Sequence, residues 1–148
     1  MEFANQIIPN LWLGNRKAPL EREHLRKFNI KLIINCTKDI EYPVDPNIQF
    51  NRLAIDDINN DESNGILADK INDLTYLIDL YLNANLGVLI HCYAGVQRSA
   101  TVVLCYLIKY KQYNIEMAKV IMKNKRSIVF FPYPTFDMFL NNYALYIK

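Results

Sequence analysis

The sequence lacks the features that mark secreted and membrane-bound proteins. Its three cysteines, Cys36, Cys92 and Cys105, are odd in number and form no CxxC pair, which argues against a disulfide framework and a structural zinc site. The first residues contain no basic segment followed by an apolar core, and no apolar run approaches the roughly 20 residues that span a bilayer. We therefore expect a protein of a reducing compartment, cytoplasmic or nuclear, that has no membrane partner.

The sequence also lacks an excess of charge of either sign. The chain carries 17 Lys and Arg against 15 Asp and Glu, a net charge of +2, so no strong field is present to attract nucleic acid or an anionic membrane. Its 148 residues, 51% of them hydrophobic, are enough for one buried core. We expect a single domain over residues 1–148 with no nucleic-acid partner, in which any preference for anions is local. The sequence leaves the oligomeric state open.

Short apolar runs alternate with segments of helical periodicity along the chain. Residues 7–14 predict two strands joined by a Pro-Asn turn, and further strands are expected at residues 31–36, 51–55 and 88–90. Periodicity and capping residues predict helices over residues 19–28, 66–83, 99–111, 114–125 and 134–147. This alternation indicates an α/β fold, with a mainly parallel sheet of about five strands flanked by helices on both faces.

Two further expectations concern a loop and the first helix. Residues 56–65 are rich in turn residues and carboxylates, so they predict a mobile loop after the 51–55 strand. In the first helix, Leu20, Leu25 and Phe28 are expected to share an inward face. His24 lies in a charged run of the same helix and is expected to be exposed.

The most informative segment is residues 88–100, where an apolar strand leads through a tight loop into an apolar helix. Such a loop directs consecutive backbone N–H groups toward one point, and the start of the helix adds the positive end of its dipole. Gly95 allows the backbone angles that this turn requires, and Arg98 can hold two oxygens of a tetrahedral anion through its guanidinium. The segment therefore predicts a phosphate site.

Cys92 lies at the start of the same loop. Amide dipoles and a helix N-terminus stabilise the thiolate form of a cysteine over the thiol, so Cys92 is expected to be a nucleophile at neutral pH. The plainer alternatives are a buried apolar cysteine for Cys92 and an ordinary surface arginine for Arg98. The neighbouring residues favour the nucleophile.

The arrangement of His91-Cys92, five further residues and Arg98-Ser99 resembles the signature of protein tyrosine and dual-specificity phosphatases. The similarity extends to other parts of the chain, namely residues 8–18, 33–38, 99–108 and 126–136. The resemblance implies a single-domain phosphatase fold, with one dual-specificity phosphatase catalytic domain over residues 1–148.

Within this superfamily, Ala94-Gly95 followed by Arg98-Ser99 is most similar to the small dual-specificity enzymes, including poxvirus-type ones. The resemblance implies a hydrolase that removes phosphate from phosphotyrosine, phosphoserine and phosphothreonine in phosphorylated proteins through a cysteinyl-phosphate, with no metal or cofactor. Two alternatives stay open: a phosphatase of the same fold acting on a phosphoinositide or an RNA 5′ phosphate, and a non-catalytic module that binds phosphoproteins. Related phosphoinositide enzymes carry lysines in this loop and related RNA triphosphatases carry a second histidine, and the loop has neither.

The resemblance also implies roles for individual residues. Cys92 would be the nucleophile, Ser99 would stabilise its thiolate as it leaves, and His91 would support the loop. Phosphate would be bound by Arg98 and by the residues before it: Tyr93, Ala94, Gly95, Val96 and Gln97.

The family's general acid is an aspartate on a mobile loop before the cysteine. Residues 53–57, Leu-Ala-Ile-Asp-Asp, resemble the family's segment that ends in this residue, so the role falls on Asp57. Asp56 is the first alternative and Asp61 the second.

Four other residues carry expectations. Cys105 is expected in the core, and core packing is favoured for Cys36 as well. The alternative for Cys36, as in some small phosphatases, is a reversible disulfide with the nucleophile. Gln97 stands where the family commonly has a small serine and is expected to reshape one rim of the pocket. Tyr133 stands where the family often has asparagine, so the support of the active-site loops is expected to differ.

Overall fold

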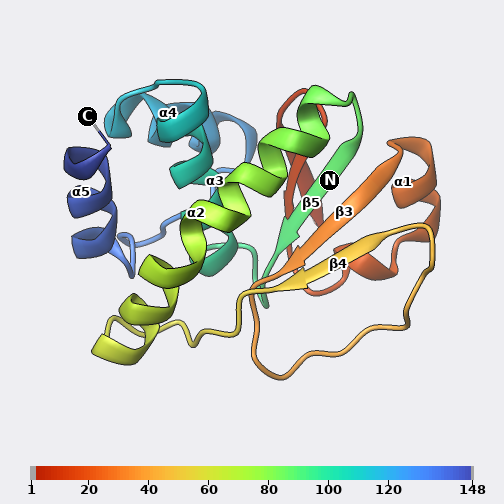
Figure 1. Ribbon diagram of the computed structural model, residues 1–148, viewed down its shortest axis with the longest axis horizontal. Helices are drawn as coiled ribbons and strands as arrows, with labels where there is room; N and C mark the ends of the chain where they lie inside the picture. The colour runs from red at the N-terminus through yellow and green to blue at the C-terminus, as the bar shows by residue number, and fades with distance from the viewer. Residues whose placement is uncertain (1–2, 148) are drawn as a thin grey trace.

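Five strands form one mixed sheet in the computed structural model, which describes residues 3–147 (Figure 1). The strands are β1 (Ala4–Ile8), β2 (Leu11–Gly14), β3 (Ile30–Asn35), β4 (Gln49–Arg52) and β5 (Gly87–His91), in the order β1-β2-β5-β3-β4 across the sheet. β1 and β2 pair antiparallel, and every other neighbouring pair is parallel. The structure confirms the predicted α/β class and the mainly parallel sheet.

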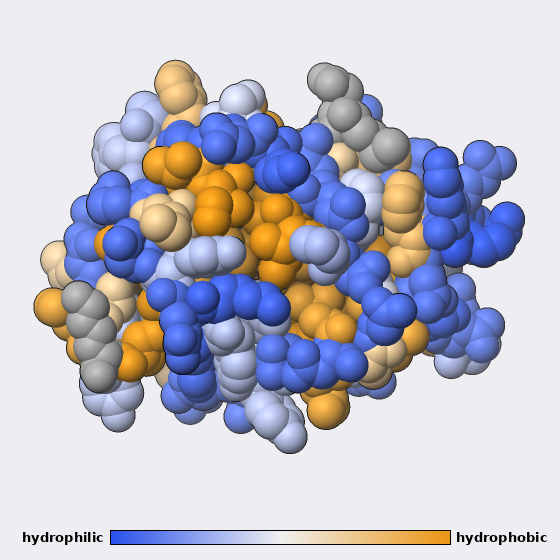
Figure 2. All heavy atoms as spheres, turned by 90° about the horizontal axis from the view of Figure 1, so that it is seen from above, coloured by the Kyte–Doolittle hydropathy of each residue, from blue (hydrophilic) through white to orange (hydrophobic). Residues whose placement is uncertain are grey.

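Helices lie on both sides of the sheet, as expected. α2 (Asp61–Asn83), α3 (Arg98–Tyr110), α4 (Ile115–Lys125) and α5 (Asp137–Tyr146) lie on one side, around the larger hydrophobic core. α1 (Arg22–Lys27) and a 3-10 helix (Ala18–Leu20) lie on the other side (Figure 1). On the face seen from above, hydrophilic residues surround a central apolar area (Figure 2). No helix within residues 3–147 is both long and apolar enough to span a membrane.

β5 lies at the centre of the sheet and leads into the loop that the sequence singled out. All five of its residues are buried, as its uninterrupted apolar run predicted. Because its neighbours β2 and β3 are parallel to it, and β4 is parallel to β3, their carboxyl ends lie at the same edge of the sheet. The segments that follow these strands therefore surround the loop after β5.

α2 begins earlier than the apolar periodicity predicted, so the expected loop over residues 56–65 is wrong in its second half. The Asn60 side chain caps the helix by accepting a hydrogen bond from the Ser63 backbone N–H at 2.8 Å. Asp61 and Glu62 lie in the first turn, where the helix dipole favours negative charge. The carboxylates and turn residues that predicted a loop therefore begin a helix.

The first helix and the strand after it also differ from their predictions. A separate 3-10 helix precedes α1, so Leu20 does not continue the register of α1 and is 57% exposed. Leu25 and Phe28 pack against the smaller core, as expected. β4 begins and ends earlier than its predicted range, although Leu53 and Ile55 beyond it are buried.

His24 is buried, and the expectation of an exposed side chain is wrong. Its ring packs edge-on against Trp12 and Phe3, with centroid distances of 4.4 and 5.2 Å, and tilted against Phe28 at 4.9 Å. The charged neighbours in the sequence concealed that His24 lies on an inward position of this short helix. Burial lowers the pKa of His24, which favours the neutral ring inside this aromatic cluster.

Candidate active site

The 92–98 loop connects β5 to α3 at the carboxyl end of the central strand. Gly95 has a φ of 70°, in the left-handed region that favours glycine. A Cβ atom at this position would lie 2.7 Å from Arg126 Nη2 and 2.7 Å from the Gly14 carbonyl oxygen. Glycine is therefore required here, because a side chain would collide with the backbone of β2 and with a buried arginine.

The backbone carbonyls of residues 93–97 all accept hydrogen bonds from donors outside this stretch. Backbone N–H groups donate to three of these carbonyls: Arg16 to Tyr93 at 3.0 Å, Phe130 to Val96 at 2.8 Å and Thr101 to Gln97 at 2.8 Å. The Arg126 side chain donates to the other two, from Nη2 to the Ala94 carbonyl at 3.2 Å and from Nε to the Gly95 carbonyl at 2.9 Å. The N–H groups of residues 93–97 donate to no acceptor in the part of the chain that the structure describes. The loop therefore leaves consecutive N–H groups available to an anion.

Cys92 and Ser99 lie close together where the strand and the helix meet. Cys92 Sγ is 3.1 Å from Ser99 Oγ. Ser99 is fully buried and Cys92 is 3% exposed, so little of the sulfur-bearing side chain reaches the surface. This contact gives the sulfur a hydroxyl partner at the first turn of α3.

Arg98 joins the 92–98 loop to the segment that carries the candidate acids. Its Nη1 donates a hydrogen bond to the Ile55 carbonyl oxygen at 3.0 Å. Ile55 is buried and directly precedes Asp56 and Asp57. The guanidinium is therefore fixed at the boundary between the loop and these carboxylates.

The structure gives Asp56 and Asp57 different surroundings. Asp56 Oδ2 forms an ion pair with Lys38 Nζ at 3.1 Å, and its hydrogen bond raises the pKa of Lys38. Asp57 instead lines a hollow of about 550 Å³ together with Val96 and Gln97 of the loop. Neither belongs to a metal-binding group, since within residues 3–147 no three His, Cys, Asp or Glu side chains are gathered to hold an ion. Of the two aspartates, Asp57 lines the same hollow as the 92–98 loop and Asp56 does not.

His91 lies directly before the loop and is fully buried. Its Nδ1 is 3.3 Å from the Cys92 carbonyl oxygen, and because a carbonyl can only accept, Nδ1 carries the proton of the neutral ring. Burial lowers the pKa of His91 to about 4. Tyr42 packs edge-on against this ring at 5.2 Å between centroids, and its hydroxyl donates to the Arg16 carbonyl at 2.7 Å. A neutral, enclosed imidazole is suited to support the loop.

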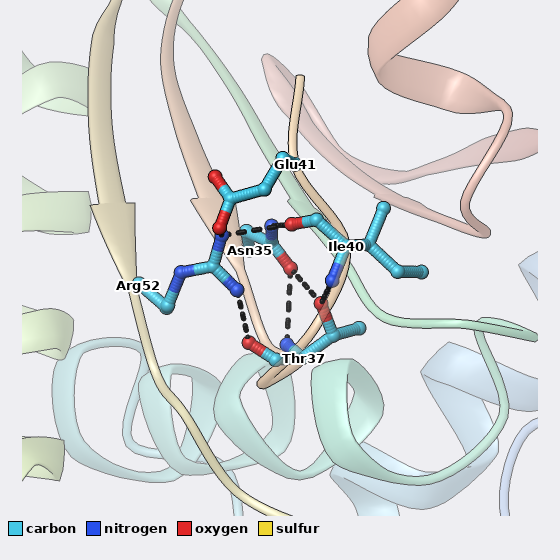
Figure 3. Close-up of polar contacts among 5 residues, drawn as sticks. All are labelled: Asn35, Thr37, Ile40, Glu41 and Arg52. Atoms are coloured by element: carbon cyan, nitrogen blue, oxygen red, sulfur yellow. Dashed lines mark hydrogen bonds and ion pairs between the residues drawn. The ribbon is translucent and has the colours of Figure 1, made fainter.

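A polar network fixes the loop that follows β3 (Figure 3). Asn35 Oδ1 accepts hydrogen bonds from the Thr37 hydroxyl at 2.6 Å and from the Thr37 N–H at 3.0 Å. Arg52 donates to the carbonyls of Thr37 and Ile40 at 2.6 and 2.7 Å, and pairs with Glu41 at 3.1 Å. The same loop carries Lys38, the ion-pair partner of Asp56, and Tyr42, which packs against His91, so the network positions both residues.

Arg126 contacts the 92–98 loop, although the sequence gave it no role. It is 4% exposed, and besides its bonds to the loop carbonyls its Nη1 donates to Asn5 Oδ1 at 2.8 Å. The residue stands in a basic run with Lys123 and Lys125, which are exposed. No local pattern distinguishes the buried arginine from these neighbours.

Gln97 also has a role that the sequence indicated only in outline. Its side chain is 6% exposed and bridges to the segment that follows α4. Nε2 donates to the carbonyls of Phe131 and Tyr133 at 3.2 and 2.9 Å, and Oε1 accepts from the Thr135 N–H at 2.9 Å. At the rim where a change was expected, Gln97 thus connects the 92–98 loop to residues 131–135.

The other two cysteines are buried in the larger core, as expected for Cys105. Burial raises the pKa of the Cys36 and Cys105 thiols, and the nearby Cys92 sulfur adds to the shift at Cys36. All three cysteines are unpaired within the described residues, so a disulfide between Cys36 and Cys92 stays a prediction.

The chain is similar in sequence to several known proteins. Residues 11–144 match the family described as dual specificity phosphatase, catalytic domain. The chain is 34% identical over 125 residues to dual specificity protein phosphatase 9 of Homo sapiens, covering 84% of this chain and 32% of the human protein. It is 33% identical over 126 residues to "Putative tyrosine phosphatase 123R" of Invertebrate iridescent virus 6, covering 84% of this chain and 81% of the viral protein. The chain thus spans about a third of the length of the human relative.

A solved structure with the same fold is the crystal structure of human DUSP28. It superposes with a TM-score of 0.87 over 97% of this chain and 94% of the other. At 23% sequence identity, this likeness concerns the fold.

Proposed function

The chain belongs to the dual-specificity phosphatase family, and on this premise we propose that it removes phosphate from phosphotyrosine, phosphoserine and phosphothreonine in proteins. The observation that carries the proposal is the 92–98 loop. The carbonyls of residues 93–97 are held by donors outside the stretch, while their N–H groups meet no acceptor within residues 3–147, and Cys92 stands at the start. Such N–H groups beside a nucleophilic sulfur suit a phosphoryl group that is being transferred.

In the first step, the Cys92 thiolate attacks phosphorus, and an S–P bond forms as the bond from phosphorus to the substrate oxygen breaks. The loop N–H groups and the Arg98 guanidinium stabilise the oxygens of the transferred group. Asp57 gives its proton to the departing phenol or alcohol oxygen. The products are a cysteinyl-phosphate, an ionised Asp57 and the dephosphorylated side chain.

In the second step, a water molecule attacks phosphorus while Asp57 takes one of its protons. The S–P bond breaks, inorganic phosphate is released, and Cys92 returns to the thiolate. The Ser99 hydroxyl, 3.1 Å from the sulfur, donates a hydrogen bond to the thiolate as it leaves. His91 holds the Cys92 carbonyl as a neutral donor throughout. The cycle requires no metal and no cofactor, because protein groups supply the charge stabilisation.

Hydrolysis of p-nitrophenyl phosphate in the presence of EDTA tests this chemistry. We expect the wild-type chain to release p-nitrophenolate, vanadate to inhibit it, and the Cys92→Ser variant to be inactive. Cys105→Ala is the matched control, because Cys105 is a buried cysteine that the mechanism does not use. Activity that survives in Cys92→Ser, or that disappears equally in Cys105→Ala, contradicts the proposal.

A second experiment compares substrate classes. Phosphopeptides carrying phosphotyrosine, phosphoserine or phosphothreonine are assayed beside a phosphoinositide and a 5′-triphosphorylated RNA, and we expect the peptides to have the highest kcat/KM. A preference for the lipid or the RNA supports a same-fold phosphatase with a non-protein substrate. Phosphopeptide binding without turnover supports a non-catalytic module, an outcome that the presence of Cys92, Arg98 and Ser99 disfavours.

A further inference from the structure

The hollow beside the 92–98 loop joins three parts of the chain that lie far apart in the sequence. Asp57 and Ile58 line it from the segment before α2, Val96 and Gln97 from the loop, and Phe131 and Tyr133 from the segment before α5. Its volume of about 550 Å³ lies in the range of roughly 300 to 1,000 Å³ that is usual for ligand sites. Because the hollow shares residues with the loop and with the proposed acid, it continues directly from the place proposed for the phosphoryl group.

The walls of this hollow combine apolar side chains with the uncharged polar residues Asn59, Gln97 and Thr135, and they hold one carboxyl group. The side chains of Phe131, Tyr133 and Ile58 are 73%, 71% and 54% exposed, so large apolar groups are presented to solvent at its rim. Of the residues that the structure describes, Asp57 is the one acidic or basic side chain lining it. A second phosphate or an acidic side chain would find no cation among the lining residues, whereas an aromatic ring would bury apolar area against the rim.

Gln97 fixes the side of the hollow that Phe131 and Tyr133 form. The buried amide of this residue binds the backbone at Phe131, Tyr133 and Thr135, each within 3.2 Å. Since Gln97 belongs to the loop itself, the aromatic rim is tied to the phosphate position at a set distance. A wall held in advance reduces the cost of ordering when a substrate binds.

We infer that this hollow is a substrate subsite for a large apolar or aromatic side chain immediately before or after the phosphorylated residue. The inference rests on the proposed function and deepens it. The substrate class that it names is a singly phosphorylated protein segment with an apolar neighbour, in preference to one with a second phosphate or a run of acidic residues. Phe131 and Tyr133 are the residues that set this preference, and Gln97 is the residue that positions them.

The test is a set of phosphotyrosine peptides that differ in one flanking residue, either phenylalanine, glycine, glutamate or phosphoserine, placed on each side in turn. We expect kcat/KM to be about tenfold higher for phenylalanine than for glycine on at least one side, and lowest for phosphoserine. In Phe131→Ala and Tyr133→Ala, the ratio of phenylalanine to glycine should fall toward one. Because the ratio compares two peptides on the same variant, a general loss of activity cancels.

Tyr146→Ala is the matched control, since Tyr146 is an aromatic residue with 85% exposure that lines a different hollow, between α2 and α5. The ratio should keep its wild-type value there. A ratio near one in the wild-type chain, a preference for phosphoserine or glutamate, or a ratio unchanged in both rim variants overturns the subsite.

Failure of the proposed function has a different result, namely no hydrolysis of p-nitrophenyl phosphate by the wild-type chain. The subsite is then read from binding of the same peptides to the Cys92→Ser variant by fluorescence anisotropy. Tighter binding of the phenylalanine peptide, lost in the added Phe131→Ala change, supports the subsite, and equal binding of all peptides overturns it.

Discussion

Replacing Arg126 by methionine removes the donors that hold two carbonyls of the 92–98 loop and keeps an unbranched apolar stem of similar reach. Hydrogen bonds to charged groups contribute about 1.5–3 kcal/mol each, and release of a buried charge offsets part of the loss. We therefore expect the free energy of unfolding to fall by about 2–4 kcal/mol. For a chain of this size that corresponds to a decrease in Tm of roughly 4–16 °C.

The same change should lower activity by more than its effect on stability explains. Without Arg126, the carbonyls of Ala94 and Gly95 lose their outer partners, and the N–H groups beside them lose their fixed direction. A displacement of about 1 Å at a reacting group costs about 10²-fold, so kcat/KM for p-nitrophenyl phosphate should fall by about that factor at a temperature where the variant is folded. Arg126→Lys keeps the charge without the planar fork and should recover stability better than activity.

Lys125→Met is the matched control, because it removes the same charge from the preceding residue, which is exposed. Its free energy of unfolding should stay within about 0.5 kcal/mol of wild type, with unchanged activity. Urea unfolding followed by the fluorescence of the single tryptophan, Trp12, gives the stabilities. If Arg126→Met and Lys125→Met unfold at the same urea concentration and hydrolyse the substrate equally, Arg126 does not hold the loop and the reasoning is refuted.

Three other results are expected. Asp57→Ala should lower kcat on a phosphotyrosine peptide by roughly 10² to 10⁴ while Asp56→Ala has a small effect, and the reverse order would assign the acid to Asp56. Because burial lowers the pKa of His91 from 6.5 to about 4, the unfolded chain takes up its proton first as the pH falls, and about 3 kcal/mol of stability should be lost between these values. Urea midpoints at pH 7 and pH 4.5 measure this loss, which should be smaller in His91→Asn than in the wild-type chain. An equal loss of stability in the two chains counts against the role of His91. If Cys36 forms the alternative disulfide, mild peroxide links it to Cys92 reversibly; a mass spectrum with sulfinic acid at Cys92 and no linked peptide contradicts the disulfide and supports core packing of Cys36.

The parts of the fold that could be predicted are those with local signals. The apolar run at β5 and the asparagine cap of α4, where Asn114 accepts from the Met117 N–H at 2.8 Å, were both confirmed. The burial of His24 was predicted wrongly because its neighbours in a short helix are charged, and the start of α2 was predicted wrongly because a cap followed by acidic residues looks like a loop in a single sequence. Their burial and their helical state are decided by contacts with the sheet and by the cap geometry.

In the candidate site, too, the residues with a local sequence signal could be predicted and those that depend on distant contacts could not. Gly95, Cys92 and Arg98 could be identified because one short loop fixes their spacing. Arg126 and Gln97 could not be given their contacts, since the side-chain hydrogen bonds that they make join residues 31 to 121 positions apart. No periodicity or cap marks such a pair, and the fold has to bring the two segments together first.

Burial of Cys92 sets a condition on the proposed chemistry, because a buried thiol is the ordinary state of a free cysteine. Cys105 shows that ordinary state, with no exposure and a pKa raised by desolvation alone. Cys92 differs, because the Ser99 hydroxyl contacts its sulfur at 3.1 Å and the N–H groups of the buried residues Gly95 and Gln97 meet no acceptor within residues 3–147. A sequence that only packed a thiol would gain nothing from leaving these N–H groups without a protein partner. An anion bound beside the sulfur satisfies them, so the enclosure of Cys92 by this loop favours the phosphate site over simple core packing.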